Sequence, residues 1–595
     1  MGSTVTAILQ SMSLVANLQQ TATNGLSNLG TFKAPTFPDF LSGPLQNGFP
    51  WGPRTAARTN PYENSPTTGV VRSYDLTISR GYIAPDGVNK SVILINNQFP
   101  GPTLEANWGD TFSITVNNQI TGPKEGTALH WHGLLQRNTP WYDGVPSVQQ
   151  CPIAPGKSLR YQFKADLFGT SWYHSHYSAQ YAGGAFGALI IHGPHENIFY
   201  DVDVGPVLLT DWYHKEYFEL VKQVVSTTRG PPPFSNNNLI NGKMDFDCST
   251  IPAGGPACTP NAGISKFNFT SGKTHRLRLI NAGAEGIQRF SIDNHTMKVI
   301  AQDYVPVRPF DTKVVTLGIG QRTDVIVKAN LPSDSAVFMR SNIPQRCSTA
   351  TQPLALAAIY YEKANRTKTP KSNPQTYDDS KCGNDDLTIS KPLFPFPALP
   401  NAATTLNLDI TFGPNATGFN LWYMNNVSFR ANFDAPIFLL AAAGNTSYPY
   451  SPQWAVNNFG SNSSVRLIIR NRIGANHPMH LHGHNFFVLA EGQGEWDGKI
   501  TNYPSTTRRD VQIVQGSKDK DTPGYLVLQY DTDNPGVWPF HCHIAWHVSA
   551  GLYVNLMEQP ELIKKKTVPQ TIVQTCRDWS EYSGREVVEQ IDSGL

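Results

Sequence analysis

The hydrophobic residues of this chain recur mainly in short runs with the period of β-strands. Residues 91–95 (Ser-Val-Ile-Leu-Ile), 298–301 (Lys-Val-Ile-Ala) and 324–328 (Asp-Val-Ile-Val-Lys) are largely apolar, and residues 111–116 (Thr-Phe-Ser-Ile-Thr-Val) alternate. Successive side chains of a strand point to opposite faces, so alternation places one apolar set on a buried face. The pattern predicts an all-β protein of packed short strands.

Composition supports many strands and turns, with only short helices in the connections. Glycine and proline number 48 and 45, and only 15% of the residues are charged. Length alone suggests about four domains. We divide the chain into an irregular leader (1–68), a first β-domain (69–195), a second β-domain (196–365), a proline-rich linker (366–404), a third β-domain (405–560) and a C-terminal tail (561–595).

The charge balance argues against two classes of partner. The formal net charge is +2 at pH 7, which is too small to predict binding to nucleic acid or to an anionic membrane. No apolar stretch approaches the roughly 18 residues that a transmembrane helix needs. We therefore expect the partners to be small molecules, and neither nucleic acid nor a membrane. We also expect a monomer.

Ten of the 16 histidines and one cysteine fall into four short clusters. These are His130-Trp131-His132, His174-Ser175-His176, His477-Pro478-Met479-His480-Leu481-His482, and His541-Cys542-His543 followed by His547. Imidazole with a single thiolate is the ligand set that suits copper. A zinc site is usually closed by four ligands, and eleven clustered ligands exceed that number. The clusters predict several copper ions.

The spacing within each cluster suggests how the ligands are shared. Residues i and i+2 of a strand lie on one face, so each His-x-His pair can present two imidazoles in one direction. In residues 541–543 the histidines face one way and the thiolate faces the other. A blue-copper site uses two histidines, one cysteine and a weak axial group, for which Cys542, His477 and His547 are the candidates. The other eight histidines suffice for three coppers.

The four motifs HWHG, HSHY, HPMHLHGH and HCHIAWHVSAGL resemble the copper motifs of the multicopper oxidases. The run from about residue 70 to 595 resembles the fungal laccases, ascomycete type in particular. The resemblance implies three cupredoxin-like Greek-key β-sandwich domains. It also implies four coppers: one type 1, one type 2 and a coupled type 3 pair, with the last three held between the first and third domains.

Matching by motif position distributes the ligands among these coppers. His477, Cys542 and His547 match the type 1 ligands, and His130 and His480 match the type 2 ligands. The coupled pair would be held by His132, His174 and His543 on one copper and by His176, His482 and His541 on the other.

Two further residues match functional positions of the resembled family. Leu552 lies ten residues after Cys542, at the position that faces the blue copper axially. Leucine cannot coordinate, and removing an axial donor favours Cu(I) and raises the potential. Asp143 follows the first cluster, and oxygen reduction consumes protons, so we predict a proton-relay role for its carboxylate.

At the substrate side this sequence departs from the family pattern. Many laccases have an acidic residue just ahead of a Leu-Ile-Asn-Gly segment, where it takes the proton of the phenol. Here the segment is residues 239–242, and Asn236 stands at the acidic position. We expect Asn236 to contact substrate beside His547, with the role of base left open. At the C-terminus, Asp592-Ser593-Gly594-Leu595 resembles a tail that enters the channel to the coupled coppers, with Leu595 at its tip.

The remaining cysteines indicate an oxidising compartment. Besides Cys542 there are six, which allow 15 pairings. Cys248 and Cys258 are close enough to form a small loop, and the resemblance implies the pairs Cys151 with Cys576 and Cys347 with Cys382. Eight Asn-x-Ser/Thr sequons are present. Residues 1–32 carry no charge and lack the basic start of a signal peptide, so we predict a secreted glycoprotein from the family and the cysteines.

We predict a laccase, which oxidises phenols and aromatic amines by one electron each and reduces O2 to two waters. Lignin fragments, plant defence phenolics and pigment precursors stay open as natural substrates. The enzymatic alternative is a ferroxidase, which needs acids near the blue-site histidines; Glu491 and Glu495 are nearby in sequence. A simple copper carrier would need only His477, Cys542 and His547, so the eight other histidines argue against it.

Overall fold

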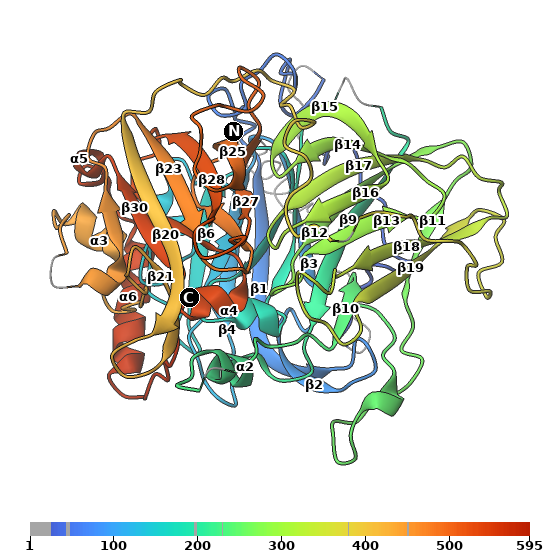
Figure 1. Ribbon diagram of the computed structural model, residues 1–595, viewed down its shortest axis with the longest axis horizontal. Coiled ribbons are helices and arrows are strands. Elements are labelled where there is room, and N and C mark those ends of the chain that lie inside the picture. Colours follow the sequence, from blue (N-terminus) through green and yellow to red (C-terminus); the bar gives the residue numbers. More distant parts are fainter. Residues whose placement is uncertain (1–24, 43–47, 196–198, 229, 379, 449–450) are drawn as a thin grey trace, which may run out of the picture.

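The computed structural model describes residues 25–42, 48–195, 199–228, 230–378, 380–448 and 451–595. Within these residues the chain is built almost entirely from strands, which confirms the predicted all-β class. Figure 1 shows three groups of strands, with the second group (green) on one side, the third (orange to red) on the other and the first (blue to cyan) between them. Of the predicted leader, residues 1–24 lie outside the described residues.

The first domain forms two four-stranded sheets. Their orders are β2-β1-β4-β6 and β3-β8-β7-β5. In β4 partly exposed and buried side chains alternate, as the polar–apolar alternation of residues 111–116 predicts. The bounds are β1 (Val71–Ile83), β2 (Lys90–Ile95), β3 (Gly101–Asn107), β4 (Thr111–Asn118), β5 (Leu129–Trp131), β6 (Ser158–Lys164), β7 (Gly169–Ser175) and β8 (Phe186–His192).

The second domain has a six-stranded and a five-stranded sheet, with orders β10-β9-β12-β17-β14-β15 and β11-β19-β18-β13-β16. The two predicted runs at 298–301 and 324–328 lie in β14 and β17, which pair with each other. The bounds are β9 (Val202–Trp212), β10 (Asn237–Ile240), β11 (Ser265–Phe269), β12 (Thr274–Asn281), β13 (Gln288–Ile292), β14 (Met297–Gln302), β15 (Val305–Thr312), β16 (Val314–Leu317), β17 (Arg322–Lys328), β18 (Ala336–Asn342) and β19 (Leu354–Tyr361).

The third domain repeats this arrangement, with orders β21-β20-β23-β28-β25-β26 and β22-β30-β29-β24-β27. The second of these sheets places β24 beside β29, the two strands that carry the last two histidine clusters. The bounds are β20 (Thr404–Pro414), β21 (Asn420–Met424), β22 (Val456–Asn458), β23 (Ser464–Asn471), β24 (His477–Leu481), β25 (Phe486–Gln493), β26 (Arg508–Arg509), β27 (Val511–Val514), β28 (Gly524–Asp531), β29 (Gly536–Cys542) and β30 (Tyr553–Glu558).

The helices are short and lie in the connections, as predicted. The longest described helix, α6, precedes the C-terminal residues and lies at the edge of the molecule in Figure 1. The α-helices are α2 (Tyr217–Val224), α3 (Ile437–Ala442), α4 (Ala545–Ser549), α5 (Pro560–Ile563) and α6 (Gln570–Ser583), and the 3-10 turns are η1 (Pro140–Tyr142), η2 (Gln180–Gly183), η3 (Cys248–Thr250) and η4 (Pro452–Trp454).

Burial shows which domains share a core. One cluster of buried apolar side chains runs from Leu29 to Ile572 and takes in the first and the third domain together with part of the second, such as Leu208 and Trp212. The rest of the second domain has a cluster of its own, which extends from Val207 to Tyr361. The first and third domains therefore pack as a unit, and this junction is where the four histidine clusters meet.

Three disulfides join the expected pairs of cysteines. They join Cys151 to Cys576, Cys248 to Cys258 and Cys347 to Cys382, and Cys542 is buried and unpaired.

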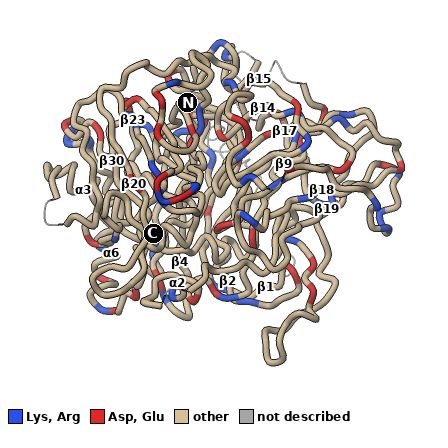
Figure 2. The backbone as a smooth tube through the Cα atoms, in the orientation of Figure 1, with Lys and Arg blue, Asp and Glu red and all other residues tan. Residues whose placement is uncertain are grey.

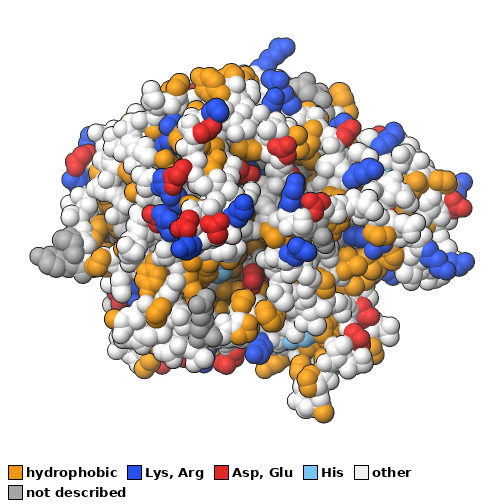
Figure 3. Space-filling model, viewed as in Figure 1, with side chains coloured by type: hydrophobic (Ala, Val, Ile, Leu, Met, Phe, Trp, Pro, Cys, Tyr) orange, Lys and Arg blue, Asp and Glu red, His pale blue; other side chains and the backbone are white. Residues whose placement is uncertain are grey.

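Charged residues of both signs are interspersed along the backbone (Figure 2) and over the face in view (Figure 3). No described helix is long and apolar enough to cross a membrane.

Candidate metal centre

Strand pairing brings the four histidine clusters together. In the first domain His130 on β5 lies opposite His174 on β7 in an antiparallel pair. In the third domain His480 on β24 lies opposite His541 on β29, and Met479 lies opposite Cys542. The rings of His130 and His482 are 4.0 Å apart, so the two pairs of strands face each other across the domain junction.

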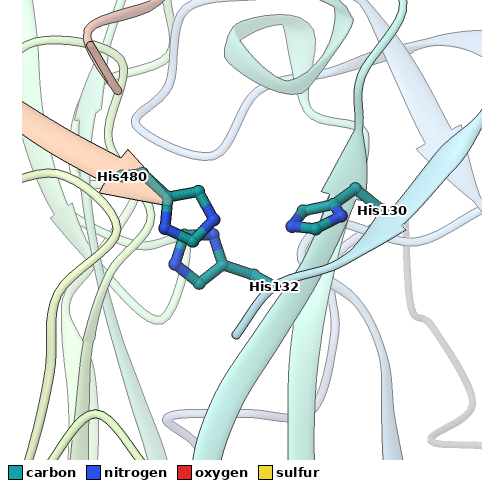
Figure 4. Close-up of side chains that lie close together, drawn as sticks. All are labelled: His130, His132 and His480. Atoms are coloured by element: carbon teal, nitrogen blue, oxygen red, sulfur yellow. The ribbon is translucent and has the colours of Figure 1, made fainter. Parts of the chain in front are cut away.

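Eight histidines form one buried group at this junction. Three sets of ligand atoms lie within 4.8 Å of one another: His130, His132 and His480; His132, His174 and His543; and His176, His482 and His541. Figure 4 shows the first set, in which His480 from the third domain approaches His130 and His132 from the first. The two triplets predicted for a coupled metal pair are therefore brought together in space.

Hydrogen bonds set which nitrogen of each ring is free. In four of these rings Nδ1 donates its proton to a backbone carbonyl oxygen, which leaves the Nε2 lone pair for a metal. The pairs are His130 to Asp143, His174 to Ser175, His480 to Asp510 and His541 to Cys542. His132 is reversed, because its Nε2 lies 3.2 Å from the Asp510 carboxylate and its Nδ1 points to His543.

The free nitrogens face one another in a way that suits a cation. His482 Nδ1 lies 2.8 Å from Asp143 Oδ2 and His541 Nδ1 donates to a carbonyl, yet their Nε2 atoms are only 3.0 Å apart. Burial lowers the pKa of both rings, that of His541 to about 3. Two neutral rings would then point lone pairs at each other, which is unfavourable unless a positive ion lies between them. The donor set fits copper.

A second, smaller group lies on the other face of β29. Cys542 Sγ is 3.6 Å from His477 Nδ1 and 3.5 Å from His547 Nδ1, and the two nitrogens are 3.0 Å apart. Burial raises the pKa of the Cys542 thiol, so the thiolate needs a cation beside it. Leu552 is fully buried and its backbone N–H donates to the His547 carbonyl. As the alternation predicted for residues 541–543 requires, the Cys542 thiol therefore lies on the opposite face of the strand from the rings of His541 and His543.

Two carboxylates contact the buried histidines. Asp143 is fully buried; its Oδ2 contacts His482 and its carbonyl accepts from His130. Asp510, which sequence reasoning missed, contacts His132 through its carboxylate and is held by a bidentate ion pair with Arg322 at 2.5 and 2.7 Å. It stands directly before β27, and its nearness to the site comes from the pairing of β27 with β24. The only signal in the sequence is an acid at the start of an apolar strand.

Comparison with known proteins identifies the family. Sequence models described as multicopper oxidase match residues 77–196, 203–364 and 416–562. The chain belongs to the multicopper oxidase family. It is 38% identical over 572 residues to oxidoreductase OpS5 of Beauveria bassiana, covering 93% of this chain and 92% of that protein. It is 37% identical over 554 residues to laccase-2 of Botryotinia fuckeliana, covering 92% of each.

A solved structure agrees with this membership. The laccase from Botrytis aclada matches with a TM-score of 0.84 and 35% identity, covering 92% of this chain and 98% of that one. The prediction of three cupredoxin-like domains is confirmed. This multicopper oxidase is a copper-binding oxidoreductase, and its laccase relatives favour laccase over ferroxidase activity.

A cavity of about 370 Å³ opens beside the smaller histidine–cysteine group. His547, which is partly exposed, lines it together with Trp422, whose ring is 4.4 Å from the His547 ring. The cavity also holds Glu285, whose Oε2 is buried without a hydrogen-bond partner among the described residues. Burial raises the pKa of Glu285 to about 8. We missed this residue because no spacing links it to the histidine motifs.

The substrate contact predicted for Asn236 stays a prediction. Asn236 is not among the described residues that line the cavity. Its side-chain oxygen accepts from the backbone N–H of His214, and its backbone N–H donates to the Trp212 carbonyl. Both bonds hold the segment of Asn236 against residues 212–214.

The C-terminal residues are packed inside the protein. Leu595 is 1% exposed, and Asp592 and Ser593 are also buried. Asp592 accepts from the hydroxyl of Ser178, and the Gly594 carbonyl accepts from the Ser178 backbone N–H. Ser178 lies two residues after His176, so the tail is anchored close to the buried histidine group.

Proposed function

We propose that this oxidase is a phenol-oxidising laccase that takes one electron from each phenol or aromatic amine and reduces O2 to two waters. The observation that carries this proposal is the position of Cys542. Its thiol contacts His547 at the cavity, while its neighbours His541 and His543 belong to the buried group. One tripeptide therefore spans the distance between the substrate cavity and the site suited to oxygen.

The ligand geometry supports four copper ions. One would be held by His477, Cys542 and His547, one by His130 and His480, and a coupled pair by His132, His174 and His543 and by His176, His482 and His541. Bound copper would supply the one-electron chemistry that oxidises phenol and reduces oxygen. Leu552 would stand at the axial position of the first ion without coordinating it.

The substrate side needs a proton acceptor, because a phenol that loses an electron becomes far more acidic. We assign this role to Glu285, the one carboxylate among the described residues that line the cavity. The phenol proton passes to the Glu285 carboxylate, and the electron leaves through the His547 edge that faces the cavity. The role of base, which the sequence left open, is thereby given to Glu285, and the predicted substrate contact of Asn236 is unaffected.

On the oxygen side, four protons and four electrons convert one O2 into two waters. Asp143 contacts histidines of two clusters and is placed to hold a proton near them. Asp510 contacts a different histidine of the buried group, His132. Leu595 and the buried tail would close the approach through the Ser178 side.

The protein is further proposed to be secreted, monomeric and glycosylated. The three disulfides support an oxidising compartment. Ferroxidase activity receives less support, because the two acids that motivated it are occupied elsewhere. Glu491 bonds Gln512 and Asn384, Glu495 pairs with Arg470, and neither is among the described residues that line the cavity.

A steady-state comparison tests this proposal. With copper-loaded enzyme, kcat/KM for 2,6-dimethoxyphenol is expected to exceed kcat/KM for Fe(II), with four phenols oxidised for each O2 consumed and no hydrogen peroxide released. A preference for Fe(II), or release of peroxide in proportion to oxygen use, would contradict the laccase assignment.

A further inference from the structure

The loop that carries Glu285 is folded around one buried carboxylate. Asp211, at the end of β9, accepts backbone N–H groups from three successive residues. Ala284 donates to Oδ1 at 2.6 Å, and Glu285 and Gly286 donate to Oδ2 at 2.9 and 2.8 Å. A Cβ on Gly283 would lie 2.8 Å from Asp211 Oδ1, so glycine is needed for this close approach.

The same carboxylate is linked to the segment that carries His547. The Tyr213 hydroxyl donates to Asp211 Oδ2 at 3.2 Å and accepts from Trp546 Nε1 at 3.1 Å. The backbone N–H of Ala545 donates to the Ala284 carbonyl at 2.8 Å. These two connections fix the position of the Glu285 loop relative to α4, and the first of them runs through Asp211.

Both carboxylate oxygens of Asp211 accept hydrogen bonds, which favours the ionised form, although burial raises the pKa of this carboxyl. It is 3% exposed, and no ion pair to it is found among the described residues. Backbone N–H groups stabilise a carboxylate through their dipoles but do not neutralise its net charge. A second negative charge on Glu285 would therefore be repelled by the first.

We propose that Asp211 and Tyr213 are positioning residues for phenol oxidation: Asp211 holds the loop that carries Glu285 at the cavity, and Tyr213 links Asp211 to the segment that carries His547. This inference rests on the assignment of Glu285 as the proton acceptor. It deepens the assignment by naming the groups that hold Glu285 in place and the charge that lies beside it.

The electrostatics of the cavity agree with this arrangement. The pKa of Glu285 is raised to about 8, first by burial and next by the charge of Asp211. Besides Asp211 and Tyr213, the titratable or charged described side chains that face Glu285 are Cys542, His547 and Arg346. The first two would be metal ligands, and Arg346 is exposed at the rim.

The test compares two variants that separate the charge of Asp211 from the link that Tyr213 makes. Asp211→Asn removes a negative charge, so Glu285 should ionise at lower pH and the acidic limb of kcat/KM for 2,6-dimethoxyphenol should move down by about one pH unit. Tyr213→Phe removes the hydroxyl that joins Asp211 to Trp546 but keeps the charge of Asp211, so phenol kcat/KM should fall while the limb stays in place. Ferrocyanide, which gives an electron without a proton, should show neither change in kcat/KM.

Further variants separate position from charge. Asp211→Glu keeps the charge but lengthens the side chain, so phenol kcat/KM should fall while the limb stays in place. Glu491→Gln removes another buried acid, whose pKa is raised to about 7 by burial, and should leave the limb unmoved. If Asp211→Asn does not fold, the test rests on Tyr213→Phe and Asp211→Glu, in both of which phenol kcat/KM should fall while the limb stays in place.

The outcomes distinguish this inference from the function on which it rests. If Glu285→Gln leaves the acidic limb of the phenol profile in place, Glu285 is not the base and the assignment under Proposed function fails. If Glu285→Gln abolishes the limb, but Asp211→Asn leaves it at the wild-type pH and Tyr213→Phe leaves phenol kcat/KM unchanged, the positioning roles are overturned.

Discussion

Asp143 Oδ2 and His482 Nδ1 lie 2.8 Å apart, although 339 residues separate them in the chain. The Asp143 carbonyl also accepts from His130 Nδ1 at 2.8 Å. One residue thus orients an imidazole from the first domain and another from the third. It fixes which nitrogen of each ring is free, and its carboxylate remains beside the group where oxygen chemistry would occur.

Replacing Asp143 by asparagine should slow the oxygen half-reaction selectively. The amide oxygen can still accept a hydrogen bond, but the side chain can no longer carry a proton. Reoxidation of the reduced enzyme by O2 should slow by about 10²-fold, while anaerobic bleaching of the blue band by phenol should keep its wild-type rate. Stopped-flow absorbance measures both steps. Equal slowing of the two steps would show that Asp143 acts on structure alone.

Replacing Leu552 by methionine should lower the potential of the blue site. A thioether at the axial position donates electron density and stabilises Cu(II), whereas leucine donates none. Redox titration against mediators of known potential measures the change directly. An unchanged or higher potential would mean that residue 552 does not face the metal, despite its contact with the His547 backbone.

Replacing Glu285 by glutamine should impair the oxidation of phenols and spare the oxidation of outer-sphere electron donors. The pKa of Glu285 is raised to about 8, so wild-type kcat/KM for phenol should rise with pH as this carboxyl loses its proton. Glutamine cannot accept a proton, so kcat/KM for phenol should fall by about 10²-fold and lose this rise. Ferrocyanide oxidation is the matched control. An equal loss with both donors would indicate a disturbed cavity instead of a missing base.

Removing residues 592–595 should disturb the buried copper group more than the blue band. Asp592 and Gly594 bond Ser178, close to His176, and Ser593 N–H donates to the Ser549 carbonyl at the end of α4. Loss of these contacts should slow turnover and alter the electron paramagnetic resonance signal of the type 2 copper. Wild-type kinetics and spectra in the truncated enzyme would show that the tail has no part in the site.

The grouping of the histidines could be predicted from sequence because each cluster is local. His-x-His spacing and strand alternation place pairs of imidazoles on one face before any tertiary contact is known, and Cys542 follows the same rule. Asp510 and Glu285 could not be predicted, since their nearness to the histidines arises from the pairing of β24 with β27 and from a loop closed around Asp211. The substrate contact of Asn236 stays a prediction from its motif position.

The most direct test is the copper content per chain of the wild type and of Cys542→Ser, measured by mass spectrometry of the metal alongside the visible spectrum. The account predicts four coppers and an intense blue band in the wild type, and three coppers with no blue band in the variant, because the eight buried histidines form their own site. Fewer than four coppers in the fully loaded wild type, or a blue band that survives in Cys542→Ser, would contradict it.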